Sequence, residues 1–119
     1  MADQLDSAPM QALVDLLRAA DLSADLDPAD VNLPGCWLAL DRVGHANMAG
    51  TLRLECQLYL IAPDADPRRA LDALGQLHHT VLSVLDPDGP VTTQGVVMPG
   101  DPTPLPALVV PVYLYTTGE

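Results

Sequence analysis

The chain has 119 residues, of which 49% are hydrophobic and 18% charged, so it can form one domain, spanning residues 1–119, with a real core. Its 16 acidic residues face five Arg and no Lys, which gives a net charge of -11 at pH 7. Because nucleic-acid binding depends on cations that displace counterions from the phosphates, we expect no specific binding to DNA and no binding to anionic membranes.

The first predicted element is an amphipathic helix that begins after Ser7. Serine is favoured at the position before a helix, and apolar residues then recur at helical spacing. They are Met10, Leu13, Val14, Leu16, Leu17 and Ala20. Residues 21–35 follow, and their content of Asp, Pro and Gly is typical of an exposed connector.

Two strand-like segments come next and predict a β-hairpin. Residues 36–43 fit one strand, and residues 51–62 alternate between apolar and polar side chains, as a strand with one buried face does. The side chains expected to face inward are Leu52, Leu54, Cys56, Leu58 and Leu60, and those expected to face outward are Arg53, Glu55, Gln57 and Tyr59. The loop of residues 44–50 is longer than a tight turn and is bounded by Gly, so we expect it to project.

A second helix is predicted from the pair Asp66-Pro67, because Asp can accept from the first free amides and Pro suits the first helical position. Its apolar stripe consists of Leu71, Leu74, Leu77, His78, Val81, Leu82 and Leu85. Residues 91–98 and 107–116 predict two further strands. The prolines of residues 99–106 predict an irregular, exposed loop between these strands.

The resulting order, α-β-β-α-β-β, predicts an α+β fold. Neighbouring strands joined by short links favour a mainly antiparallel sheet of about four strands, with both helices packed on one face. The opposite face would carry side chains that are too apolar to stay bare on a monomer, which predicts that part of it is an interface. These side chains are Trp37, Tyr59, Val109, Pro111, Tyr113 and Tyr115.

Residues suited to catalysis or metal binding are few. Cys36 and Cys56 lie in apolar, strand-like segments and fit small buried side chains better than a disulfide. The three His residues show none of the short spacings that metal ligands have. A pair of Cys36 and His45 would lack the orienting group and oxyanion site that nucleophilic catalysis needs. We therefore expect no enzymatic activity, no cofactor and no bound metal.

The sequence shows neither a secretion signal nor a membrane-spanning segment. Its first residues lack the positive start and apolar run of a signal peptide. No segment approaches the about 18 apolar residues of a membrane span. We expect a protein that is made in the cytoplasm and does not enter a membrane.

Several features of order and composition extend over most of the chain. An N-terminal amphipathic helix precedes a strand pair that opens with residues 33–38 (LPGCWL), and the second helix starts with residues 66–71 (DPRRAL). Two strands split by a proline-rich loop follow, and the last contains residues 108–113 (LVVPVY). This pattern resembles the tail terminator proteins of long-tailed, siphovirus-type bacteriophages, which are small α+β subunits that form a hexameric ring on the tail tube.

The resemblance implies a non-catalytic virion structural protein that caps the tail tube as a ring and provides the head-to-tail joining surface. Its partners would be further copies of itself, the tail tube protein and the head-tail connector protein, and DNA would pass through the ring. It would lie at the end of the tail that faces the head, after synthesis in the host cytoplasm. Two alternatives remain: another phage neck or tail-completion subunit, or a small dimeric regulatory α+β domain that binds a ligand.

Six residues are candidate contacts with neighbouring subunits. Met48 and Leu105 are apolar residues within the two predicted loops, which we expect to be assembly surfaces. The residues expected on the outward strand face are Arg53, Tyr59 and Tyr113. The sixth, Arg68, lies in the first turn of the second helix, where the helix dipole disfavours a cation. It is either merely exposed or paired with an acidic surface on a neighbour.

Overall fold

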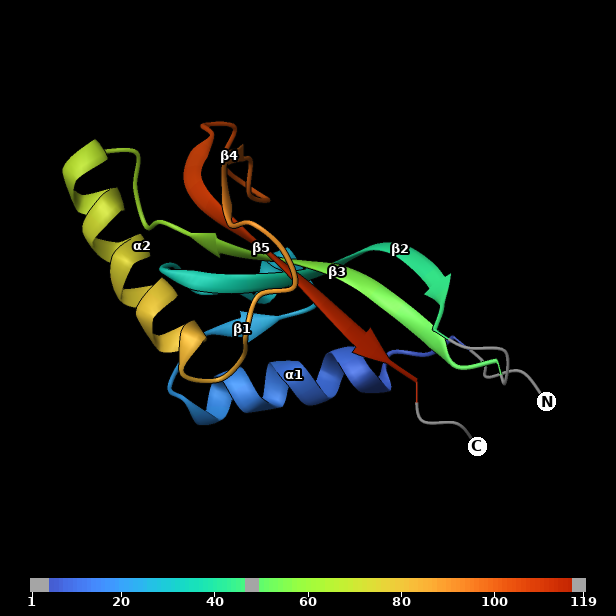
Figure 1. Cartoon of the computed structure of the whole chain (residues 1–119). Helices are drawn as coiled ribbons and strands as arrows, with labels where there is room; N and C mark the ends of the chain where they lie inside the picture. The colour runs from blue at the N-terminus through green and yellow to red at the C-terminus, as the bar shows by residue number, and fades with distance from the viewer. Residues whose placement is uncertain (1–4, 47–49, 117–119) are drawn as a thin grey trace.

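The computed structural model describes residues 5–46 and 50–116 (Figure 1). Its elements are α1 (Ala8–Ala19), β1 (Ala24–Asp25), the short 3-10 helix η1 (Pro28–Asp30), β2 (Gly35–His45), β3 (Leu52–Ile61), α2 (Pro67–Leu82), β4 (Thr92–Val96) and β5 (Leu105–Tyr115). The predicted α+β class is confirmed, with five strands in the described residues where about four were expected.

The strands form one mixed sheet in the order β1-β2-β3-β5-β4. β1 pairs in parallel with β2 over two residues, and all other neighbouring strands pair antiparallel. At the centre lies β3, whose Leu54 is opposite Val43 of β2 and Leu114 of β5. The segment with the clearest period-two alternation in the sequence is therefore the middle of the sheet.

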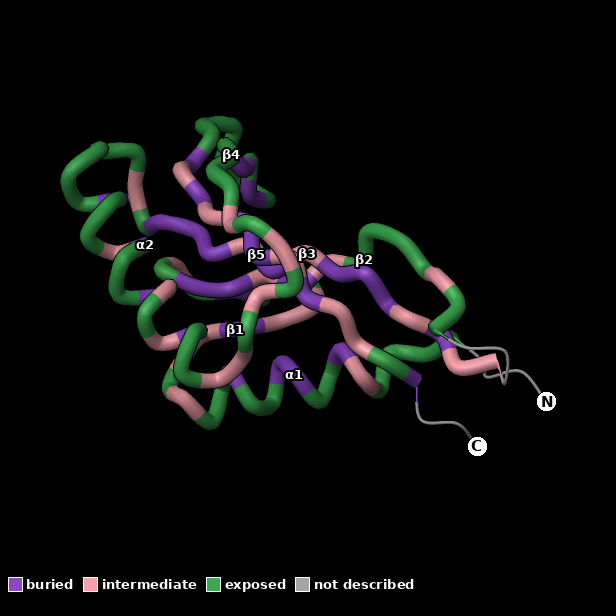
Figure 2. The backbone as a smooth tube through the Cα atoms, in the orientation of Figure 1, coloured by how far each residue is buried: buried purple, intermediate pink, exposed green. Residues whose placement is uncertain are grey.

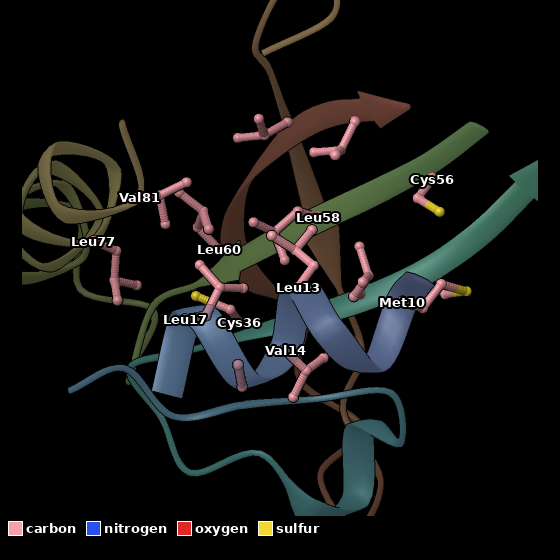
Figure 3. Close-up of a cluster of buried hydrophobic side chains, with 14 of the residues drawn as sticks. Met10, Leu13, Val14, Leu17, Cys36, Cys56, Leu58, Leu60, Leu77 and Val81 are labelled. Atoms are coloured by element: carbon pink, nitrogen blue, oxygen red, sulfur yellow. The ribbon is translucent and has the colours of Figure 1, made fainter. Parts of the chain in front are cut away.

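Both helices pack on the same face of the sheet, which we call the inner face, and bury the main hydrophobic cluster against it (Figure 3). The inward side chains predicted for residues 54–60 of β3 belong to this cluster, which confirms the predicted strand faces. The helices contribute Met10, Leu13, Val14 and Leu17 from α1 and Ala70, Leu74, Leu77 and Val81 from α2. Three leucines of the predicted stripes do not belong to this cluster, because Leu16 is 58%, Leu71 is 71% and Leu82 is 41% exposed. Each lies one position away from the residues that face the sheet.

A second, smaller cluster covers one end of the opposite, outer face near β4 (Figure 2). Its buried members are Val31, Ile61, Val96, Met98, Leu105 and Ala107. The prediction that Leu105 is an exposed contact is therefore wrong: it is 6% exposed and lies opposite Val96 of β4. Part of the outer face, which was predicted to be an interface, is therefore covered by residues of the same chain.

The proline-rich loop ends earlier than predicted, because Pro106 is the second residue of β5. Its carbonyl accepts a hydrogen bond from the Ala62 amide at 3.0 Å. The registered pairing of β5 with β3 begins one residue later, at Ala107. Pro106 therefore stands at the end of the hydrogen-bond ladder between β3 and β5, where the missing N–H of proline costs the least stability.

The connector of residues 21–35 contains more structure than predicted. The amide of Cys36 donates to the Ser23 carbonyl at 2.8 Å, which ties β1 to β2. Asp27 caps η1 by accepting from the Ala29 amide at 2.9 Å. The chain then passes so close to Gly35 that a Cβ there would lie 2.4 Å from the Asn32 carbonyl oxygen. Only glycine fits without a shift of the backbone.

The two predicted helix starts have different outcomes. Asp66 accepts from the amides of Arg68 and Arg69, both at 3.1 Å, so the predicted cap of α2 is confirmed. Ser7 precedes α1 as predicted but makes no capping bond with its side chain. Asp6 takes this place, because its carboxylate accepts from the Ala8 amide at 2.9 Å.

Candidate functional site

The outer face is open at the end away from the second cluster. Five residues meet there, and we call them the open outer patch: Arg42, Arg53, Glu55, Tyr113 and Tyr115. Strand register brings them together, because directly opposite residues project from the same face of a sheet. Glu55 of β3 is opposite Arg42 of β2 and Tyr113 of β5, and the neighbouring outward residue Arg53 is opposite Tyr115.

Glu55 holds the open outer patch together. Its Oε1 accepts a hydrogen bond from Arg42 Nη2 at 2.9 Å, and its Oε2 accepts one from Arg53 Nη2 at 3.1 Å. The hydrogen bond from Arg53, reinforced by the charge of Arg42, holds the pKa of Glu55 below its ordinary value. Arg53 Cζ lies 5.1 Å from the centre of the Tyr113 ring, within cation-π range. These contacts fix two guanidinium groups around a single carboxylate.

The open outer patch is accessible to a partner. The side chain of Arg42 is 73% exposed, that of Arg53 is 37% exposed, and Tyr115 is 51% exposed. Tyrosine and arginine are enriched in protein interfaces, because they combine a flat apolar surface with hydrogen-bond donors. The patch can therefore bind carboxylates and apolar groups of another chain. It contains no Ser, Cys, Lys or His that could act as a nucleophile.

Sequence reasoning missed Arg42, because the simple alternation of Cys36 and Leu38 would place it on the inner face. A β-bulge at Asp41 shifts the register, so that Leu40 is opposite Cys56 while Arg42 is opposite Glu55. A bulge inserts one extra residue and moves all later side chains to the other face. The signal was present in the sequence, since two charged residues in a row would otherwise put one of them into the core.

Tyr59, a predicted contact, lies in the middle of the outer face and packs within its own chain. Its ring stacks on Trp37 with centroids 4.9 Å apart and an interplanar angle of 22°. Its hydroxyl donates to Gln57 Oε1 at 2.7 Å, and Trp37 Nε1 donates to the Leu26 carbonyl at 3.1 Å. Tyr59 therefore belongs with the second cluster and is half-buried, and Gln57 separates it from Glu55 on the outer face.

The remaining predicted contacts do not join the patch. Arg68 is exposed on α2, which covers the inner face, so it belongs to a different surface. In the neighbouring Arg69, Nη1 lies 3.7 Å from Asp64 Oδ2 of the same chain, so this arginine has an acidic partner without a second subunit. Met48 lies outside the described residues. Of the six predicted contacts, the structure brings Arg53 and Tyr113 together, and Tyr59 lies on the same face but outside the patch.

The cysteines and histidines do not assemble into a reactive site. Burial raises the pKa of the Cys36 thiol to about 12 and that of Cys56 to about 11, so neither is a thiolate at neutral pH. Cys36 and His45 lie nine residues apart along the extended β2, which is about 30 Å. Among residues 5–46 and 50–116, no three His, Cys, Asp or Glu side chains group closely enough to hold a metal ion.

Comparison with known proteins gives no match. No protein family model, no curated protein and no solved structure matches the chain. Within the described part of the chain, neither helix has the length and hydrophobicity needed to span a membrane. A functional assignment therefore depends on the residues of the chain itself.

Proposed function

We propose that this chain is a non-catalytic structural subunit that assembles with other protein chains, and that it acts as a tail terminator of a long-tailed bacteriophage. In this role it forms a hexameric ring, caps the tail tube and joins it to the head connector. The assignment to a tail terminator comes from the sequence pattern described above. The proposal of an assembly role has a separate structural support in the open outer patch.

The observation that carries the assembly role is the composition of the open outer patch. Two of the five Arg and two of the three Tyr of the chain lie within this one patch. Ordered guanidinium groups and half-exposed rings lose little conformational freedom when a partner covers them, so binding costs less than it would for mobile side chains. A surface of this kind suits a permanent protein contact.

The charge of the chain suits a ring that encloses a DNA passage. With a net charge of -11, most of its surface repels phosphates. A wall that repels phosphates lets DNA pass without being held, because no counterions are released on contact. The cations of the open outer patch would then be covered by protein instead of facing the passage.

The proposed function is tested by adding the purified chain to assembling tail tubes and measuring tube length in electron micrographs. The wild-type protein should stop tube growth and give a narrow length distribution. Tyr115→Ser should leave the protein folded but allow tubes to grow longer. The matched control is Leu16→Ser, which removes a similarly exposed side chain (58%) from α1 and should cap normally. Unlimited tube growth with the wild-type chain would contradict the tail terminator assignment.

The alternative regulatory domain predicts a different result in the same experiment. Such a protein would leave tube length unchanged, form a dimer and bind a small molecule. An apolar groove beside α2 does not favour it, since it is an open depression lined by Ala65, Pro67, Ala70, Leu71, Leu74 and Pro106. A small-molecule site is normally a deep cleft with a few converging polar groups.

A further inference from the structure

Groups of opposite charge border the outer face. At one end the open outer patch holds Arg42 and Arg53 around Glu55. Beside the edge of the sheet, η1 follows β1, which pairs in parallel with β2 at Trp37, and the exposed residues Asp27 and Asp30 lie at the two ends of η1. The chain between Asp30 and β2 runs through Val31, a member of the second cluster on the outer face. Acidic and basic surfaces thus border the same face of one subunit.

The two groups do not pair within one chain. Trp37 and Arg42 are opposite Tyr59 and Glu55, which are four residues apart on β3, so about 13 Å separate them along the sheet. In the described residues Arg42 pairs with Glu55, and Asp30 is in none of the ion pairs. Oppositely charged surfaces that do not pair within one subunit can pair between two subunits. Contacts of one surface with a different surface of the next copy are head-to-tail, and they close into a ring when the rotation between copies allows it.

We propose that the open outer patch of one subunit binds the acidic turn of η1 (Pro28–Asp30) in a second copy of this chain. Arg42 donates to the Asp30 carboxylate of that copy, while Tyr113 and Tyr115 pack against the neutral part of the turn. The inference rests on the proposed function, because it assigns the contact through which the subunits of the ring join.

Residues around both surfaces favour this pairing over the other acids and cations. Asp25 is already paired with Arg18 at 2.9 Å, so it is less available than Asp30. Asp41, the exposed extra residue of the bulge, lies beside Arg42 but takes part in none of the ion pairs found in the described residues. On α2, Arg68 and Arg69 follow closely after Asp64 and Asp66, and the cation-π contact found in the described residues involves neither of them.

Charge reversal and its rescue test the pairing. Arg42→Glu alone and Asp30→Arg alone should each raise the dissociation constant of the ring at least tenfold, measured by sedimentation at low ionic strength. The double variant carrying both changes in one chain should recover assembly, because the two new charges attract again. Arg68→Glu is the matched control and should assemble as wild type does, since it makes the same charge change on another surface.

A neutral variant keeps the test valid if Arg42→Glu is unstable beside Glu55. Arg42→Gln should remain folded, as judged by its melting curve, and should still weaken assembly. Normal assembly of a folded Arg42→Gln, or no recovery in the double variant, would overturn the pairing while leaving the proposed function intact. A wild-type chain that stays monomeric at all concentrations and never caps tubes would instead overturn the proposed function, and the pairing with it.

Discussion

Leu71 and Leu74 provide a direct test of how α2 sits on the sheet. Both belong to the apolar stripe predicted from the sequence, yet Leu74 is 6% and Leu71 is 71% exposed. Replacing either by Ala makes the same chemical change in the same helix, and Ala is slightly the better helix former. Any difference in stability between Leu71→Ala and Leu74→Ala therefore measures burial.

The expected losses follow from these exposures. Truncating a buried Leu to Ala costs about 2 to 5 kcal/mol, from lost burial and from the cavity that remains. Two open grooves border Leu74, next to Pro106 and Ala107, so the neighbouring side chains can relax into the space that Ala leaves. The loss of unfolding free energy for Leu74→Ala should therefore lie near the lower end of this range, at about 2 to 3 kcal/mol. For Leu71→Ala the change should stay within about 0.5 kcal/mol.

The assay is urea denaturation of each variant at a concentration low enough to keep the chain monomeric. Leu74→Ala should shift the midpoint to lower urea without changing the slope, and Leu71→Ala should superimpose on wild type. In a thermal melt, a loss of 2 kcal/mol corresponds to a fall of about 6 to 10 °C for a domain of this size. Equal destabilisation by the two variants would refute the placement of α2.

Three further predictions concern other residues. Gly75→Ala should stabilise the protein by up to about 1 kcal/mol, because a Cβ there meets no atom within 4 Å, whereas Gly35→Ala should destabilise it strongly; thermal melts of the two variants decide this. Cys36 and Cys56 should react with a thiol reagent at pH 7 only at the rate of unfolding, and fast labelling of the folded chain would show that they are not buried. Arg53 lowers the pKa of Glu55 in the folded chain below the ordinary value of 4.5. The ionised Glu55 should therefore contribute its full stabilisation above pH 4.5, and this contribution should be lost as the pH falls through the pKa that Glu55 has in the folded state. Compared with Glu55→Gln, the wild-type chain should therefore lose more stability on acidification below about pH 4.5, and parallel pH profiles would contradict the role of Glu55.

The parts of the fold that local sequence determines were predictable. The alternation along β3 identified its buried face, because a strand with one side against the core needs a period of two. Asp66 and Pro67 identified the start of α2, because capping and the first helical turn depend on those residues alone. The outward placement of Arg53 and Tyr113 followed from the same alternation.

The parts that depend on distant contacts were not predictable. β1 exists only because β2 lies beside it, and two residues carry no periodic signal of their own. The burial of Leu105 depends on Val96 and Met98 folding over the outer face, and the surrounding prolines gave the opposite signal. Arg42 was not predicted in the open outer patch, because a bulge changes the register of β2 and moves its side chain to the outer face.

If this chain assembles into a closed ring, as we propose, the mass of the particle that the wild-type protein forms in solution will show it. Native mass spectrometry or sedimentation equilibrium over rising protein concentration at low ionic strength would give this mass. We expect a discrete species of six times the 12.6 kDa chain, with no stable dimer. A chain that remains at 12.6 kDa at every concentration, or that stops at a dimer, would contradict it.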